Sequence, residues 1–352
     1  MKQYIFNSIL LFAISLSASI SFSDDDPNQI NEFVNVKNKD FKEYRRSRLT
    51  STKNGKSTYT YAYPDEEIHH EILGSIPNPT TIYHALRTEG EILFNVKNNF
   101  DKYSRRVNSE PINNQKEFVL LFGCSYLFGY GAEDHQVVHS YLTRAQNKYY
   151  AYNYAVGGTG TNTVLGLLQN RDFQKEIPMK RGHAYYIFIE DHVFRANGFA
   201  QQRSWLRNSP FFEKENGKMV YRGSFAKAQP FTTWLFKLLN DDLNITGLLG
   251  VNFPKEKDSH FIYTCDLIEG SKQEFHAQYP NGEFTVYIHP LGGQMLPPLL
   301  NCLKERKIRI LESKIKDSPK YRYEIDGHPT PIANREVAED IAKDLLLLDQ
   351  QP

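Results

Sequence analysis

The feature that most constrains this fold is a short apolar run that ends abruptly at a glycine. Residues 118–122 are all apolar and Gly123 follows them, which predicts a strand buried on both faces, as in a parallel sheet. Ser125 comes two residues later, and Gly129 and Gly131 allow sharp turns of the backbone. The Ser125 hydroxyl is therefore expected at the carboxyl end of a strand, where open α/β sheets bind ligands. Taken alone, the stretch also fits an ordinary turn with an incidental serine.

A second loop, near the end of the sequence, carries an aspartate and a histidine two residues apart. Asp326 and Gly327 are a turn-forming pair, His328 follows, and Thr330 and Pro331 suit a helix N-cap and the first helical position. A turn with no further role is the simpler interpretation. A histidine can, however, take the proton of a serine hydroxyl, and a carboxylate can orient that histidine. The pairing of an early serine loop with a late acid-base loop predicts a nucleophilic serine site.

The serine loop resembles the first sequence block of the SGNH (GDSL-type) hydrolases. That block, Gly-Asp-Ser-x-x-x-Gly, is matched by Gly123, Ser125 and Gly129, with Cys124 in the place of the aspartate. In the family the serine is the nucleophile and its own N–H helps to bind the oxyanion, whereas the aspartate is not the catalytic acid. The resemblance extends, in order and spacing, over about residues 116–347.

Two further blocks of the family have counterparts in this chain. An asparagine followed by glycines is matched by Asn153, Gly157 and Gly158, which implies that the Gly158 amide also helps to form the oxyanion hole. The last block, Asp-x-His in some branches of the family, is matched by Asp326 and His328. The resemblance therefore implies a Ser-His-Asp triad with Ser125 as its nucleophile.

The third block of the family, Gly-x-Asn-Asp, is not kept. The apolar residues 186–189 lead instead into Glu190, Asp191 and His192. In the family the asparagine donates a hydrogen bond to the oxyanion, whereas an ionised carboxylate could only accept one and would repel the charge. We predict that His192 supplies the missing donor. In the alternative, His192 is a packing or surface histidine and the hole has two amide donors only.

The function implied by the resemblance is hydrolysis of carboxylic esters through an acyl-enzyme. Lipid, small acyl and carbohydrate acetyl esters all occur as substrates in the family, and no cofactor is implied. Two alternatives stay open: a polysaccharide O-acetyltransferase or deacetylase, and a catalytically silent binding protein on the same fold. The acyl group, the alcohol and the oligomeric state are not determined by the sequence.

Residues 116–350 alternate between apolar strands and amphipathic helices, which is the pattern of a doubly wound parallel sheet. We expect a three-layer α/β/α domain with a mostly parallel, flavodoxin-like sheet. The expected strands are 118–122, 149–156, 184–189, 283–289 and 308–312, and the expected helices are 134–146, 161–174, 262–279, 297–307 and one that starts at Pro331. In the last helix an apolar residue recurs every three or four positions from Val337 to Leu348, one face for docking on the sheet.

An insert near residues 195–255 interrupts the alternation and is rich in aromatic residues. Trp205, Phe211, Phe231 and Trp234 stand in a mixed polar background. Aromatic side chains at helical spacing usually pack inward, so we expect them in the core of the insert. The alternative is that they line an acyl or sugar pocket.

The part of the chain before the alternating pattern divides in two. Residues 1–23 have a basic start, an apolar run and small residues before an acidic stretch, the pattern of a secretory signal peptide, and this predicts a periplasmic or secreted protein. An uncleaved membrane anchor is the alternative. Residues 24–115 are expected to form an accessory segment, irregular or marginally helical at 41–48 and then β-rich with a hairpin turn at Glu89 and Gly90. We expect the segment to cap the sheet, the alternative being that it shapes a substrate cleft.

Composition excludes several classes of partner. The 352 residues have a formal net charge of +1, so there is no overall positive field to hold nucleic acid or an anionic membrane. There are three cysteines, too few for a disulfide-dependent scaffold. Cys124 is expected as a small buried residue behind Ser125, and whether Cys265 and Cys302 pair is left open. No spacing of histidine, cysteine or acidic residues matches a metal site, and we predict no metal and no cofactor.

Overall fold

The computed structural model describes residues 46–53, 56–63, 67–88, 91–293, 297–313, 315–323 and 327–350. The expected signal peptide, the expected turn at Glu89 and Gly90, and Asp326 all lie outside the described residues.

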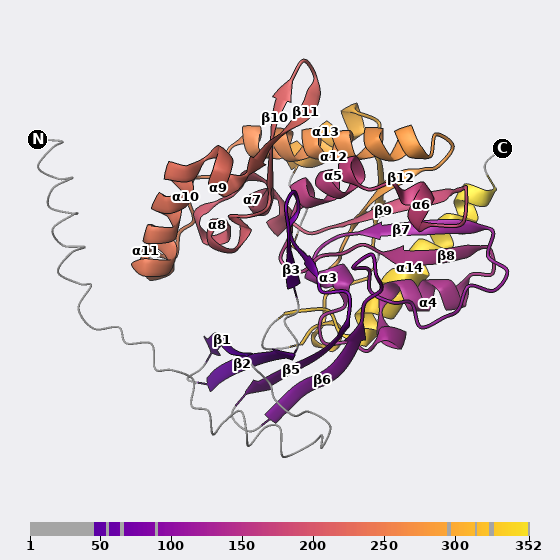
Figure 1. Cartoon of the computed structure of the whole chain (residues 1–352), viewed down its shortest axis with the longest axis horizontal. Coiled ribbons are helices and arrows are strands. Elements are labelled where there is room, and N and C mark those ends of the chain that lie inside the picture. Colours follow the sequence, from indigo (N-terminus) through magenta and orange to yellow (C-terminus); the bar gives the residue numbers. More distant parts are fainter. Residues whose placement is uncertain are drawn as a thin grey trace, which may run out of the picture.

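A five-stranded sheet forms the centre of the molecule (Figure 1). All four of its strand pairs are parallel, and the order across it is β13-β12-β9-β7-β8. The strands are β7 (Glu117–Phe122), β8 (Tyr149–Asn153), β9 (Gly182–Phe188), β12 (Phe284–Ile288) and β13 (Arg309–Glu312). Counted along the chain, the order is 2-1-3-4-5, which is the flavodoxin-like arrangement. The predicted fold class is confirmed.

Successive residues of each strand point to opposite faces of the sheet, and each face packs on its own helices. Phe118, Leu120 and Phe122 of β7 belong to one hydrophobic cluster, and Val119 and Leu121 belong to the other. Because both faces are buried, the strand is apolar at consecutive positions rather than at alternate ones.

Helices cover both faces of the sheet (Figure 1). Side chains of α5, α12 and α13 pack on one face, and those of α4 and α14 pack on the other. Their bounds are α4 (Val138–Ala145), α5 (Thr161–Asn170), α12 (Asp258–Gln278), α13 (Pro297–Glu305) and α14 (Pro331–Asp349). The predicted apolar face of α14 is confirmed, since Val337, Ile341 and Leu345 are fully buried and Leu348 packs beside them.

Two predicted helices are shorter in the structure than in the sequence pattern. The stretch 134–146 contains a 3₁₀ turn (Asp134–Gln136) before α4, and the stretch 161–174 breaks between α5 and α6 (Phe173–Glu176). The break is held by a side chain from α12. Gln278 donates to the carbonyls of Leu168 and Arg171 and accepts from the Phe173 N–H, so a tertiary contact takes up backbone groups that a continuous helix would use internally.

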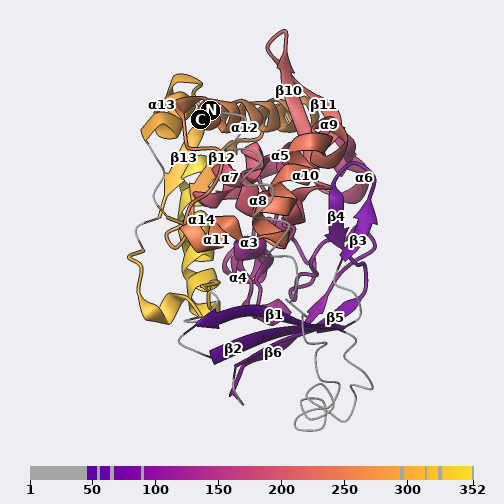
Figure 2. The same ribbon diagram turned by 90° about the vertical axis from the view of Figure 1, so that its left-hand side faces the viewer.

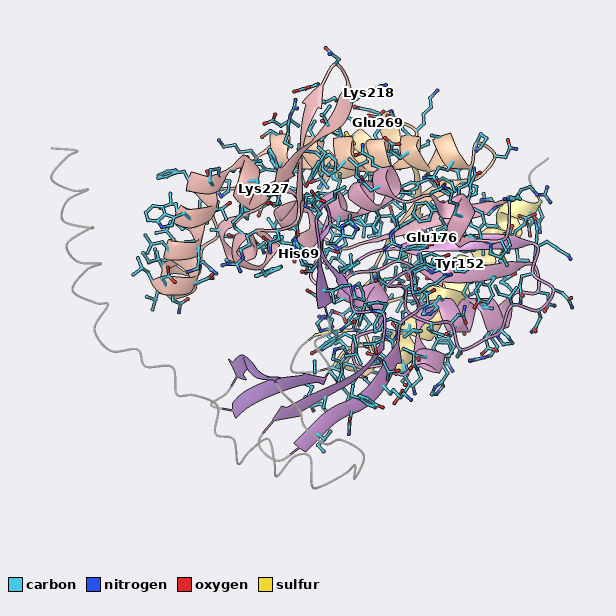
Figure 3. All side chains as sticks on the ribbon, in the orientation of Figure 1. His69, Tyr152, Glu176, Lys218, Lys227 and Glu269 are labelled. Carbon is cyan, nitrogen blue, oxygen red and sulfur yellow. A yellow bond between two sulfur atoms is a disulfide. The ribbon has the colours of Figure 1, made fainter. Side chains whose placement is uncertain are left out.

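The insert folds into short elements that the sequence pattern did not reveal. Its helices are α7 (Asp191–Asn197), α8 (Ala200–Leu206), α9 (Phe225–Ala228), α10 (Pro230–Lys237) and α11 (Ile245–Leu249). Between them lies a hairpin, β10 (Pro210–Glu215) and β11 (Lys218–Ser224), and Figure 3 marks Lys218 near its tip. The turn residues Asn216 and Gly217 both have positive φ. An Asn-Gly pair is the usual signal for such a two-residue turn.

The accessory segment contributes two small antiparallel sheets. One has the order β1-β2-β5-β6 and lies across one end of the molecule, below α3 (Ser125–Phe128) and α4 in Figure 2, and the other is the hairpin of β3 and β4. The strands are β1 (Arg46–Lys53), β2 (Lys56–Tyr63), β3 (Glu67–His70), β4 (Gly74–Pro77), β5 (Thr81–Thr88) and β6 (Glu91–Asn99). The expected helix at 41–48 is wrong in its described part, because residues 46–48 begin β1 and pair with β2.

A disulfide joins α12 to α13. Cys265 and Cys302 are bonded across a sequence separation of 37 residues, which settles the pairing that the sequence left open. Cys124 is the free cysteine and is buried, as expected. Among the described residues, no helix has the length and apolarity that crossing a bilayer would require.

Replacement of Cys302 with serine is expected to lower the free energy of unfolding by about 3–4 kcal/mol, because the unfolded chain loses a crosslink that closes a loop of this length. Urea unfolding of the wild-type and variant proteins measures the difference. Dithiothreitol should produce the same loss in the wild type and no further loss in the variant. Equal stability of the two oxidised proteins would contradict the prediction.

Candidate active site

The structure brings Ser125 and His328 together. The His328 Nε2 atom lies 2.9 Å from the Ser125 Oγ atom, although the two residues are 203 positions apart in the sequence. Both side chains are partly exposed. A neutral imidazole at this distance can accept the hydroxyl proton, which is the contact that activates a serine.

Ser125 is placed by the sharp turn that ends β7. It is the first residue of the short helix α3 (Ser125–Phe128), directly after the buried Cys124. The first N–H groups of a helix have no acceptor within the helix, so the Ser125 amide is available at the carboxyl end of the sheet. Gly129 then turns the chain with a φ of 81°, and a Cβ atom there would come within 2.4 Å of the Val137 side chain. Only glycine fits both requirements.

The loop that carries Ser125, residues 123–132, is called the nucleophile loop. The buried side chain of Arg106 holds it from behind. Its guanidinium donates to the carbonyl of Phe128 at 2.7 Å, to that of Gly129 at 2.8 Å and to that of Ala132. Its Nε atom pairs with Asp134 at 3.1 Å. Burial lowers the pKa of Arg106, and the Asp134 carboxylate opposes that shift. Arg106 thus donates to three carbonyls of an irregular loop, two of which, those of Gly129 and Ala132, also accept from the Ala132 N–H and the Asn98 side chain.

The loop that carries His328 is closed by backbone hydrogen bonds. The Tyr323 N–H donates to the His328 carbonyl at 2.9 Å, and the Gly327 N–H donates to the Tyr323 carbonyl at 2.8 Å. The rings of Tyr126 and Tyr130, on the nucleophile loop, lie 5.7 and 4.8 Å from the His328 ring. The imidazole of His328 therefore packs against the nucleophile loop. Asp326 lies outside the described residues, and its predicted role as the orienting acid stays a prediction.

The glycine loop after β8 is fastened to the nucleophile loop by Asn153. This buried side chain donates to the Leu127 carbonyl at 3.0 Å and accepts from the Ala155 N–H at 2.9 Å. Gly158 has a φ of 69°, a left-handed conformation that glycine adopts without strain. No acceptor for its N–H is found within the described part of the chain. The predicted amide donors therefore come from two adjacent loops that are bonded to each other.

Ser125 and His328 open into a cleft of about 400 Å³. The accessory segment forms one wall through Glu67, Ser75 and Pro77. Shaping a cleft was the less favoured alternative for this segment, and the structure supports it. The remaining lining residues are Phe128, Tyr130, Gly157, Gly158, Thr159, Arg195, Trp205, Leu206, Asn208 and Ser209.

Three of the four aromatic residues singled out in the insert are exposed, contrary to expectation, whereas Phe211 is partly buried with its ring 5.4 Å from that of Phe225. Trp205 is 50% exposed and lines the cleft, where its indole N–H donates to the Gly158 carbonyl at 3.3 Å. Phe231 and Trp234 are 69% and 57% exposed, with their rings 5.9 Å apart on α10. Helical spacing predicts a common face, and here that face is turned outward. Phe225 and Phe212, which are fully buried, pack inside instead.

His192 lies in the core rather than at the cleft surface. It is 1% exposed, its Nδ1 atom is 2.7 Å from the Tyr186 hydroxyl, and its ring stacks on that of Tyr186. Burial, followed by the charge of Arg195, lowers its pKa well below the ordinary value, so it is neutral near pH 7. His192 is not among the residues that line the cleft. Its role as an oxyanion donor stays a prediction that its position does not favour.

Sequence reasoning missed two arginines of this site. Arg106 precedes the catalytic pattern, and Arg195 follows the unmatched third block by a few residues. The signal for Arg195 was its spacing from Asp191, since an acid and a base four positions apart on a helix form an ion pair. No spacing signal marks Arg106. Among the residues that the structure describes, no three histidine, cysteine or acidic side chains gather in a way that could hold a metal ion.

No protein-family model matches the sequence, and no curated protein matches it. Solved structures with similarity to the chain include an acetyl xylan esterase, Est2A, from the rumen bacterium Butyrivibrio proteoclasticus, with 10% identity, 76% of this chain and 69% of that chain covered, and a TM-score of 0.41. The psychrotrophic esterase EstA from Pseudoalteromonas sp. has 11% identity, coverage of 68% and 100%, and a TM-score of 0.37. Est24, a carbohydrate acetylesterase from Sinorhizobium meliloti, has 11% identity, coverage of 66% and 100%, and a TM-score of 0.35.

Replacement of Arg106 with methionine is expected to lower the free energy of unfolding by about 3–5 kcal/mol, because buried carbonyls lose a donor and the Asp134 carboxylate loses a charged partner. Urea unfolding measures the loss. Arg335→Met, which removes an exposed arginine from α14, is the matched control and should change stability little. A loss below about 1 kcal/mol in the Arg106 variant would show that the loop keeps its shape without this side chain.

Stability is expected to fall in mild acid because of His139. Burial, followed by the charge of Arg106, lowers the pKa of His139 from 6.5 to about 3. Between these two pH values His139 binds a proton in the unfolded chain but not in the folded chain. Its contribution to the free energy of unfolding is therefore complete above pH 6.5 and is lost as the pH falls toward 3. The Nδ1 atom faces the amide of Asn153 at 3.2 Å and the Nε2 atom faces the Val107 carbonyl at 3.2 Å.

The measurement is urea unfolding of the wild type and of His139→Gln at intervals between pH 7 and pH 4. The variant should lose stability less steeply on acidification, by up to about 1.4 kcal/mol per pH unit, the value for one proton. Parallel curves for the two proteins would contradict the prediction.

Proposed function

We propose that this protein is a serine hydrolase of carboxylic esters. The observation that supports the proposal most directly is the 2.9 Å contact between His328 Nε2 and Ser125 Oγ. It lies in an open cleft, at the carboxyl end of β7, beside the point where the strand order reverses. A serine, a base and two backbone amides are the groups that acyl transfer requires.

In the proposed reaction Ser125 attacks the ester carbonyl while His328 takes the hydroxyl proton through Nε2. The Ser125 and Gly158 amides bind the oxyanion. Collapse of the intermediate breaks the bond to the alcohol, which leaves with the proton from His328. Water then attacks the acyl-enzyme and gives its proton to His328, which returns it to the Ser125 Oγ atom as the bond between that atom and the acid breaks. Asp326 holds the imidazole in the required tautomer. An alcohol in place of water would make the same chemistry an acyl transfer, such as the O-acetyl transfer between sugars considered above.

The lining of the cleft supports an ester whose alcohol carries polar groups. Glu67, Asn208 and Ser209 supply hydrogen-bonding groups beside the exposed indole of Trp205. An aromatic face with polar groups around it can bind the apolar face of a ligand and orient its hydroxyls. A small acyl or carbohydrate acetyl ester fits this chemistry. A lipid ester would instead bind the outward-facing aromatic residues of α10.

We also propose that the mature protein works in the periplasm or outside the cell. The disulfide between Cys265 and Cys302 supports this location, because structural disulfides persist in oxidising compartments and are rare in the cytosol.

The proposal is tested by reaction with a fluorophosphonate probe and with a panel of nitrophenyl esters and acetylated sugars. The wild type is expected to be labelled on Ser125 and to hydrolyse at least one ester class. Ser125→Ala should not be labelled, and its turnover should fall by about four orders of magnitude or more, leaving the small residual rate seen without a nucleophile. Ser259→Ala, an exposed position on α12, is the matched control.

Asp326→Asn belongs in the same series, because a wrongly held imidazole tautomer lowers turnover by about 10⁴. Folded wild-type protein that is neither labelled nor active on any ester would leave the binding-protein alternative standing. Labelling of a residue other than Ser125 would remove its proposed role.

A further inference from the structure

We infer that Arg195 is the third stabilising group of the oxyanion hole, in the position that the sequence pattern assigned to His192. Its guanidinium lies between the nucleophile loop and the glycine loop and lines the same cleft as Ser125 and Gly158. The inference rests on the proposed function, since it concerns the negative charge that forms on the ester oxygen when Ser125 attacks.

The contacts of Arg195 are to chain neighbours of both amide donors. Its Nη1 atom donates to the Thr159 carbonyl at 2.9 Å, and Thr159 directly follows Gly158. The Cys124 thiol lies against the guanidinium, and Cys124 directly precedes Ser125. One side chain therefore touches the immediate neighbours of the two residues whose N–H groups are assigned to the oxyanion.

The close approach of α7 to the glycine loop fixes this position. A Cβ atom at Gly160 would lie 2.8 Å from the Arg195 Cβ atom, a distance that no ordinary side-chain contact tolerates. The helix can therefore pack this tightly only because residue 160 is a glycine. Since a preorganised donor needs no rearrangement during the reaction, a guanidinium held in this way is suited to the role.

Charge is retained at this site despite burial. The Arg195 side chain is 11% exposed. Burial by itself would lower its pKa, but the Cys124 thiol and the Asp191 carboxylate outweigh that effect and raise it. A permanent positive charge in a partly dehydrated cleft stabilises a developing oxyanion more strongly than it would in water.

The pairing of Arg195 with Asp191 also removes the part of the difficulty posed by Asp191 in the unmatched third block. Acidic side chains at the end of β9 would repel an oxyanion. Asp191, however, accepts from the Arg195 Nε atom through one oxygen and from Gln202 at 3.0 Å through the other. Its charge is therefore compensated by the residue four positions along α7.

Arg195 still has donors for a substrate. A guanidinium has five N–H groups. Within the described part of the chain, Arg195 uses only some of these groups, in its contacts with Asp191, Thr159 and Cys124. The remaining N–H groups belong to a side chain that lines the cleft. His192, by contrast, is hydrogen-bonded to Tyr186 inside the core and has no surface in the cleft.

The test compares Arg195→Met, Arg195→Lys, His192→Ala and Arg335→Met by steady-state kinetics on the ester that the wild type hydrolyses fastest. Arg195→Met is expected to lower kcat by about 10²–10³ while KM changes by less than about threefold, the pattern for a group that acts in the transition state. Arg195→Lys should recover part of kcat because it restores the charge. Arg335→Met should match the wild type, and His192→Ala should lose less than Arg195→Met.

The rate of fluorophosphonate labelling at Ser125 provides a second measurement, because the phosphonyl oxygen also enters the oxyanion hole. It should fall in parallel with kcat in the Arg195 variants. Circular dichroism and thermal unfolding establish whether each variant is folded. If Arg195→Met is not folded, the kcat and the labelling rate of Arg195→Lys decide the matter.

A kcat for folded Arg195→Met within about threefold of the wild type would overturn the inference and leave the proposed function intact. A large kcat loss in His192→Ala with little loss in Arg195→Met would overturn it in favour of the histidine. A wild type with neither Ser125 labelling nor esterase activity would overturn the proposed function, and the inference with it.

Discussion

The buried guanidinium of Arg106 is the interaction on which the site depends. The chain must leave β7, turn at glycine and expose a serine, so carbonyls of the turn face the interior outside the regular hydrogen-bond pattern of a helix or sheet and need side-chain donors. Arg106 satisfies those of Phe128, Gly129 and Ala132, and Asp134 compensates its charge. A lysine has no planar fork of donors with which to reach several acceptors at once. Because Arg106 precedes β7 in the chain, the nucleophile loop is completed by residues outside the alternating α/β pattern.

The parallel sheet brings the parts of the site together by its strand order. The strand order reverses at β7, which has β8 on one side and β9 on the other. Because the three strands are parallel, the loops that follow them lie together at the carboxyl edge of the sheet. The nucleophile loop follows β7, the glycine loop follows β8, and α7 with Arg195 follows β9. Each loop is bonded to the next, through Asn153 between the first two and through Arg195 between the second and third. The His328 loop then packs on the nucleophile loop from the opposite end of the sequence.

Two parts of the chain that lie outside the alternating α/β pattern add walls to the cleft. The hairpin of β3 and β4 supplies one wall and the insert supplies Trp205 and Asn208. These segments are not required for a doubly wound fold, so they are free to differ in order to suit a substrate. The outward-facing rings of Phe231 and Trp234 form an exposed aromatic pair on α10, apart from the cleft lining. The proposed nucleophile and base, Ser125 and His328, and the side chains of Glu67, Trp205 and Asn208 that would contact the substrate thus come from different parts of the fold.

The prediction from sequence was most successful where local pattern and global fold agree. The apolar run of β7 follows from burial on both faces, and the apolar stripe of α14 follows from docking on one face. Both are properties of neighbouring residues, so a single sequence reveals them. The same holds for Ser125 and His328, because glycine-containing turns at strand and helix ends are local signals. Helix ends that depend on a distant residue, such as the break at Arg171 imposed by Gln278, were not visible.

The sequence by itself determined the α/β class, the serine and histidine that meet, and the glycines that let the loops turn, since each follows from the conformational preference or burial of a short segment. Only the tertiary structure decided that Arg106 and Arg195 belong to the site, that His192 lies in the core and that Phe231 and Trp234 face outward. An arginine or an aromatic ring suits a buried or an exposed position equally well by its local pattern. Its position is decided by the partners that the folded chain brings within hydrogen-bonding or van der Waals distance, and those partners are far away in sequence.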